Sequence, residues 1–430
     1  MTKSFTIDFA WLDRHVADEA ERFTFAEIKI TVGGVVVTEL EDVHTKTIRS
    51  AARVSAYALA LWLLGNWWRL VREPERKSHS WQMSHRLGAI GQGFLWPDLS
   101  FSSDGDSVLV RMAPTPQSSQ QMVRYLNGIY ELVSVADFEA AVLSFVDAVI
   151  DRLQTMGCRT TLLQDLRKEI VDERSLPSSN RWREIEALLG HDPDEGNEEL
   201  IAALIAQGTS LGPGAVDEVL AHSKEETLDV LAFLFKHIRQ QTISMVVPDS
   251  DILRKQTAGI DSALLPWERA AIAARSARKH WSLQDGPVSN DQLRHLFSLS
   301  GNILTLSQSV KSPITVGFRN GKKDHLDTCL HTGYETSRRF ALLRVIGDQL
   351  FSADSDSFLP VTDIKTARQK FQRAFAQEFL CPADELKLFV ADDFGEEKLD
   401  DAAHYFNVST RLIETTLVNK GLIERDYVFE

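Results

Sequence analysis

The segment that decides the fold of the C-terminal half reads RRFALLRVIGDQLF (338–351), and QKFQRAFAQEFLCP (369–382) follows it after an acidic linker. Apolar side chains recur every three or four residues in both blocks, on stripes that include Leu343 and Gly347 in the first block and Phe375 in the second. Two such stripes joined by a turn must be buried against each other or against a sheet. The spacing therefore predicts a packed pair of helices.

This pair resembles the two active-site helices of the ImmA/IrrE-type zinc metallopeptidases. In that family the first helix reads roughly Arg-x-Arg-Phe-x-x-x-His-Glu-x-Gly-His, and the second carries a third acidic ligand before Phe-Ala-x-x-Leu-Leu-x-Pro. The His, Glu and second His positions are occupied here by Arg344, Val345 and Asp348. The scaffold residues around them match the family pattern: Arg338, Arg339, Phe340, Gly347, Phe375, Ala376, Glu378, Leu380 and Pro382.

The replaced residues argue against zinc hydrolysis. Such a site needs two imidazoles one helical turn apart, a third ligand, and a carboxylate that activates the bound water. Arg344 would repel a metal, Val345 cannot accept a proton, and Asp348 alone does not hold zinc. Because Arg344 and Asp348 are four residues apart, they are expected to form an ion pair in place of the metal. We therefore expect no cofactor.

The same resemblance implies a vestigial cleft that binds a protein partner or a ligand. The residues expected to line it are Arg344, Asp348, Glu378, Arg338 and Arg339.

Composition limits the class of protein. The chain has 430 residues, with 47 basic and 61 acidic side chains and a net charge of −14, which disfavours a dominant nucleic-acid surface. Its three cysteines are far apart, as is typical of a reducing cytosol, and the polar N-terminus does not resemble a signal peptide. The apolar run within 51–70 is too short to span a membrane and indicates a buried helix. We expect a cytoplasmic protein without a membrane segment.

The fold class expected from these patterns is α+β with several domains. Residues 1–115 predict an N-terminal α+β domain, with hairpins around Gly33–Gly34 and around 103–107 and a buried helix at 51–70. Residues 119–245 predict a helical region. Residues 260–430 are expected to form a degenerate, zincin-like ImmA/IrrE-like domain.

Two further groups of residues are candidate ligand or metal sites. Trp81, His85 and Trp96 flank a glycine-rich loop at 88–93, which would suit a ligand pocket or equally an ordinary loop. His325 and His331 alternate along an expected strand at 324–331 together with Asp327 and Cys329, a pattern that would suit a metal site or a plain polar strand face.

The segment 399–423 resembles a helix-turn-helix, with the turn at Asn407–Ser409 and Ser409 as an N-cap. Arg411 and Lys420 stand against Glu414 in its second helix, so the charges are poorly suited to phosphate contacts. Nucleic acid is therefore an alternative partner that the charge does not favour.

These patterns lead to one principal hypothesis and two alternatives. The principal hypothesis is a prokaryotic, non-catalytic pseudopeptidase that binds a protein partner, in the stress-response, mobile-element or phage-defence setting that the resemblance implies. The first alternative is an active metallopeptidase with a rebuilt site, formed by Asp348 with His325, His331 or His404. The second is a DNA-binding regulator that acts through residues 399–423.

Overall fold

The computed structural model describes residues 2–14, 18–118, 120–158, 161–300, 303–305, 311–321 and 324–424. Contacts divide the chain into two compact units, Met1–Ile205 and Ala206–Glu430, and the division falls within helix α8 (Glu198–Leu211). Both units combine helices with antiparallel sheets, so the predicted α+β class is confirmed. The three-part division into 1–115, 119–245 and 260–430 stays a prediction.

The first unit contains three antiparallel sheets. The predicted hairpin at Gly33–Gly34 joins β2 (Phe25–Val32) to β3 (Val35–Val36), and both glycines have positive φ, as the tight turn requires. Alternate residues of β2 are buried, because one face of the sheet lies on the core. The other strands are β1 (Phe5–Trp11), β4 (Leu40–Asp42), β5 (Thr47–Arg49), β6 (Ala52–Ser55), β7 (Leu99–Ser103), β8 (Ser107–Met112), β9 (Val123–Tyr125) and β10 (Ile129–Ser134).

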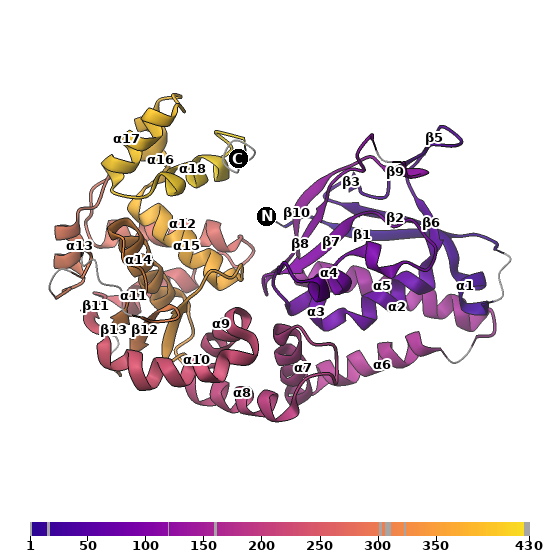
Figure 1. Cartoon of the computed structure of the whole chain (residues 1–430), viewed down its shortest axis with the longest axis horizontal. Helices are drawn as coiled ribbons and strands as arrows, with labels where there is room; N and C mark the ends of the chain where they lie inside the picture. The colour runs from indigo at the N-terminus through magenta and orange to yellow at the C-terminus, as the bar shows by residue number, and fades with distance from the viewer. Residues whose placement is uncertain are drawn as a thin grey trace. The chain divides into compact units, whose positions relative to one another are not determined.

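Helices cover the sheets of this unit, with α2 and α5 among those that pack on the strands (Figure 1). The buried segment expected as one helix at 51–70 begins with strand β6, and two helices separated at Asn66 follow it. No helix among the described residues is long and apolar enough to cross a bilayer. The helices are α1 (Glu19–Thr24), α2 (Ala56–Gly65), α3 (Trp67–Arg72), α4 (His79–His85), α5 (Val135–Thr155), α6 (Leu162–Ser175) and α7 (Pro177–Leu189).

The region predicted as helical from residue 119 begins with strands instead. β9 pairs with β4 and β10 pairs with β8, so these residues extend the sheets of the first unit. Val133 is buried in the sheet, and the first helix of this region begins only at Val135. The helical pattern belongs to the residues after Val135, whereas the conformation of β9 and β10 is set by pairing with β4 and β8.

The second unit is built on a sheet with the strand order β11 (Ile243–Val246), β13 (His325–Cys329), β12 (Thr315–Arg319) and β14 (Phe358–Val361). The strands expected near 314–319 and 324–331 are thus confirmed. The other elements are α9 (Pro213–Ser223), α10 (Thr227–Phe233), α11 (Ser250–Ala258), α12 (Pro266–His280), α13 (Asn290–Leu296), α16 (Ala383–Val390), α17 (Glu396–Phe406) and α18 (Thr410–Asn419).

The predicted helix pair is α14 (Glu335–Phe351) and α15 (Ala367–Leu380), which pack against each other. A Cβ at Gly347 would lie 2.8–3.0 Å from Phe375, so only glycine allows the helices to approach this closely. A Cβ at Gly317 of β12 would lie 2.7 Å from Val345, so the sheet also approaches α14 through a glycine. Close packing at these two glycines positions α14.

Replacing Gly347 by alanine tests this packing. We expect Gly347→Ala to lower the free energy of unfolding by about 1–3 kcal/mol, because the added methyl group displaces the ring of Phe375. Urea denaturation measures the change. Gly65→Ala is the matched control: this helical glycine has open space around its Cβ position, so the substitution should be neutral or stabilising by up to about 1 kcal/mol. Equal destabilisation by both substitutions would contradict the packing argument.

Candidate functional site

Asp348 is the centre of a buried ionic network in the second unit. Its side chain projects from α14 and has no exposed surface. Arg368, in the first turn of α15, donates from Nε to Oδ1 at 2.7 Å and from Nη2 to Oδ2 at 2.8 Å. This bidentate geometry is the strongest form of an arginine–carboxylate contact, and it engages both oxygens of Asp348.

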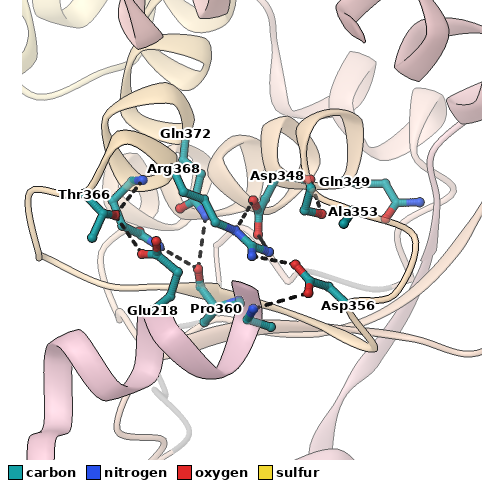
Figure 2. A network of polar contacts seen from close by, with 12 residues as sticks. Glu218, Asp348, Gln349, Ala353, Asp356, Pro360, Thr366, Arg368 and Gln372 are labelled. Atoms are coloured by element: carbon teal, nitrogen blue, oxygen red, sulfur yellow. Dashed lines mark hydrogen bonds and ion pairs between the residues drawn. The ribbon is translucent and has the colours of Figure 1, made fainter. Parts of the chain in front are cut away.

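Arg368 also binds a second carboxylate. Its Nη1 donates to Oδ2 of Asp356 at 2.6 Å, and the other oxygen of Asp356 accepts from the backbone N–H of Ala215 at the start of α9. Figure 2 shows Arg368 between the two aspartates. Burial disfavours its charge, but the two carboxylates outweigh burial and raise the pKa of Arg368 above its ordinary value. The guanidinium therefore stays charged.

Arg344 does not pair with Asp348, so the predicted ion pair between these residues is wrong. Its Nη2 donates to the carbonyl oxygen of Thr362 and to Oε1 of Gln369, both at 2.6 Å. Burial lowers the pKa of Arg344 to about 9. The reason for the difference is that Arg368 reaches Asp348 from the neighbouring helix with its planar fork aligned, whereas Arg344 points toward the segment between β14 and α15.

Glu218 is a third buried carboxyl group, contributed by α9. Its Oε2 accepts a hydrogen bond of 2.8 Å from the hydroxyl of Thr366, the N-cap residue of α15. Among the described residues it forms no ion pair. Burial raises the pKa of Glu218 to about 7, although the charge of Arg368 opposes this shift.

The arrangement does not fit a zinc ion. The expected ligand positions hold Arg344 and Asp348, and both oxygens of the aspartate are occupied by Arg368. Val345 is buried against Gly317 and offers no donor atom. Within the described residues, no group of three or more His, Cys, Asp and Glu side chains is placed to hold a metal.

The other residues expected in the vestigial cleft are buried and engaged with the protein itself. Arg338 is 4% exposed, Arg339 is 0% exposed and Glu378 is 6% exposed. Glu378 pairs with Arg275 at 3.0 Å. The two arginines donate to backbone carbonyl groups, which belong to Val288, Ile303, Thr332 and Asn407. These side chains thus tie surrounding segments to α14 and α15.

The histidines considered for a rebuilt metal site are not placed with Asp348. His331 and His404 are exposed, whereas Asp348 is fully buried and paired. His325 lies at the first position of β13 and is partly exposed, and its alternation with Asp327 and Cys329 along the strand is as predicted. Burial raises the pKa of Cys329 to about 11, which keeps its thiol protonated at neutral pH.

Trp81, His85 and Trp96 do not form one pocket. Trp81 stacks on His85 with ring centroids 4.3 Å apart, and both side chains are buried. His85 contacts Glu73 at 3.1 Å and the carbonyl oxygen of Phe101 at 2.9 Å, and burial lowers its pKa. Trp96 instead donates to the carbonyl oxygen of Gly91, which closes the glycine-rich loop. All of these contacts are internal to the fold.

Sequence reasoning missed Arg368, Asp356 and Glu218. Arg368 lies one residue before the 369–382 block, in which the family resemblance implies a third metal ligand. One weak signal was present: a cation in the first turn of a helix opposes the helix dipole, so Arg368 should have a specific partner. Asp356 and Glu218 gave no such signal, because each comes close to Arg368 only through the fold.

Comparison of the chain with family models, with curated proteins and with solved structures finds no match to any of them. The site is therefore interpreted from its own geometry and from the resemblance of its helix pair.

Replacing Arg368 by glutamine tests the importance of the network. We expect Arg368→Gln to lower the free energy of unfolding by about 3–5 kcal/mol, because it leaves Asp348 and Asp356 buried without a countercharge. Chemical denaturation at pH 7 gives the measurement. As a control, Arg294→Gln breaks an exposed ion pair with Asp291 and should cost less than about 1 kcal/mol. Similar costs for the two variants would show that the buried pair has no special role.

Proposed function

We propose that this chain is a non-catalytic pseudopeptidase, which keeps the helix scaffold of an ImmA/IrrE-like peptidase and acts by binding a protein partner. The observation that supports the proposal best is the bidentate pair of Asp348 and Arg368. The guanidinium group of Arg368 is held against Asp348, the residue in the second His position of the family pattern. The carboxylate that would have to bind a metal is already neutralised and has no free oxygen.

The lack of a general base supports the same proposal. Metal-assisted hydrolysis needs a carboxylate to accept a proton from the bound water. The residue in that position is Val345, which is fully buried against the sheet. Catalysis would therefore require both a new metal site and a new base at other residues.

The regulatory setting rests on the resemblance alone. Active members of the family cleave a repressor during stress responses or mobile-element control. A protein that keeps this scaffold without the chemistry would regulate by binding rather than by cleavage. We place the role in such a pathway in the prokaryotic cytoplasm, with phage defence as one setting.

Metal analysis of the purified protein tests the proposal. We expect the full chain, prepared without chelators, to contain far less than one zinc per chain. We also expect it to show no chelator-sensitive hydrolysis of protein substrates. Elemental analysis by mass spectrometry gives the metal content. Stoichiometric zinc in the wild type that disappears in Asp348→Ala would instead establish the rebuilt-peptidase alternative.

The DNA-binding alternative is less well supported by the charges around α18. The preceding helix α17 carries four exposed carboxylates, which would repel phosphate: Glu396, Glu397, Asp400 and Asp401. We expect duplex DNA to bind weakly, and Arg411→Ala/Lys420→Ala to leave that binding unchanged in fluorescence anisotropy. An affinity that falls steeply with salt and is lost in the double variant would favour a DNA-binding regulator.

A further inference from the structure

Helix α9 lies directly on the buried ionic network. A Cβ at Gly214 would lie 3.3 Å from Oδ2 of Asp356 and 3.4 Å from Nη1 of Arg368. At Gly212, where φ is 102°, a Cβ would lie 2.4 Å from Asp356. The two glycines therefore let the start of α9 cover the network at van der Waals distance.

The two ends of α9 are held in different ways. Next to its first residue, the carbonyl oxygen of Leu211 accepts hydrogen bonds from the backbone N–H and the hydroxyl of Ser357. Farther along, α9 is held to the segment 362–366 by the side chains of Glu218 and His222, which contact Thr366 and Asp363. Two of the side chains that attach this second half can therefore change their charge, beside the buried apolar side chains of Val219 and Leu220.

Glu218 is the one carboxyl group of the network that has no arginine partner among the described residues. Arg368 directs its three nitrogens at Asp348 and Asp356. Arg344 donates to the carbonyl oxygen of Thr362 and to Gln369, and Arg373 donates to the carbonyl oxygens of Thr362 and Ile364. Glu218 accepts a hydrogen bond from the hydroxyl of Thr366, and the side chain of Gln369 also favours its ionised form.

The charges that face Glu218 come from every element around it. The cations are Arg344 on α14 and Arg368 and Arg373 on α15. The anions are Asp348, Asp356 and Asp363. The histidine His222 lies on α9 itself. Because the arginine donors are directed elsewhere, an ionised Glu218 would be a buried charge without a direct countercharge. Such a charge is costly, and solvation of the carboxylate requires that α9 move away.

We propose that α9 is a pH-sensitive latch, which stays docked over Arg368 while the carboxyl group of Glu218 is protonated and detaches at its C-terminal half when that group ionises. Release uncovers the side of the network around Glu218, Thr366 and Asp363. This inference goes beyond the pseudopeptidase role, and it holds whether or not the chain is catalytic.

The direction of the pH effect follows from the two states of Glu218. Docking raises its pKa from the ordinary value of 4.5 to about 7, so the docked state binds the proton more tightly. Docking is therefore strongest below pH 4.5 and weakens as the pH rises to 7. Between pH 5 and pH 7 the opening equilibrium should increase roughly sixfold per pH unit, and above pH 7 it should level off.

Hydrogen exchange of the full-length protein tests the latch. We expect amide protection of residues 213–223, corrected for the intrinsic effect of pH on exchange, to fall on the order of 50-fold from pH 5 to pH 7.5. Peptides from α12 serve as the internal reference and should keep their protection. Glu218→Gln keeps an acceptor for Thr366 without a charge, so its protection should be high and independent of pH.

Two further outcomes are decisive. His222→Gln separates the contribution of the His222–Asp363 contact, and the pH dependence should persist in this variant. A wild-type profile that is flat, an equal slope in Glu218→Gln, or loss of the slope in His222→Gln would each overturn the proposal. Simultaneous loss of protection in α12 would also overturn it, because the event would then be unfolding of the whole unit.

Discussion

The second unit depends on a single buried guanidinium. Arg368 joins α14, through Asp348, to the turn before β14, through Asp356. Asp356 in turn accepts a hydrogen bond from the backbone N–H of Ala215 at the start of α9. Each of these groups would be expensive to bury alone. Together they neutralise one another and satisfy one another's hydrogen bonds, so α14, the turn that follows it and α15 must be assembled together, with the sequence-distant α9 against them.

Such a network confers less net stability than its short distances suggest. The attraction between buried charges mainly offsets their desolvation, and an apolar triad of the same volume would often be equally stable. What the network does impose is geometry. A bidentate contact allows only one register between α14 and α15, and the third nitrogen then sets the position of Asp356. The core between these helices is already filled by phenylalanine side chains, and the charges add a specific alignment of the helices.

The parts of the fold that could be predicted from sequence are those with a local signal. Gly33–Gly34 marks a hairpin, and the three-to-four spacing in 338–351 and 369–382 marks two helices, because turn chemistry and periodicity act between near neighbours. Residues 123–134 were misjudged as helical because their strands are stabilised by pairing with β4, which lies far away in the chain, and with β8, which precedes them; neither partner can be read from helical periodicity. The site was only half visible for the same reason. Arg344 and Asp348 stood out by their positions in a motif, whereas Arg368, Asp356 and Glu218 acquire their meaning from tertiary contacts.

The expectation of an Arg344–Asp348 pair shows how helical spacing can predict the packing of two helices correctly and still give the wrong ion pair. Gly347 against Phe375 and Gly317 against Val345 are van der Waals constraints, and they select the same residues whether or not the site is catalytic. The charged residues obey a different rule, since each buried charge needs hydrogen-bond partners, and in the case of Asp348 a countercharge, that only the final structure supplies. Asp348 found it on the neighbouring helix rather than one turn away on its own. A pattern of packing residues is therefore evidence about packing, and the activity of the site has to be argued from its charged residues alone.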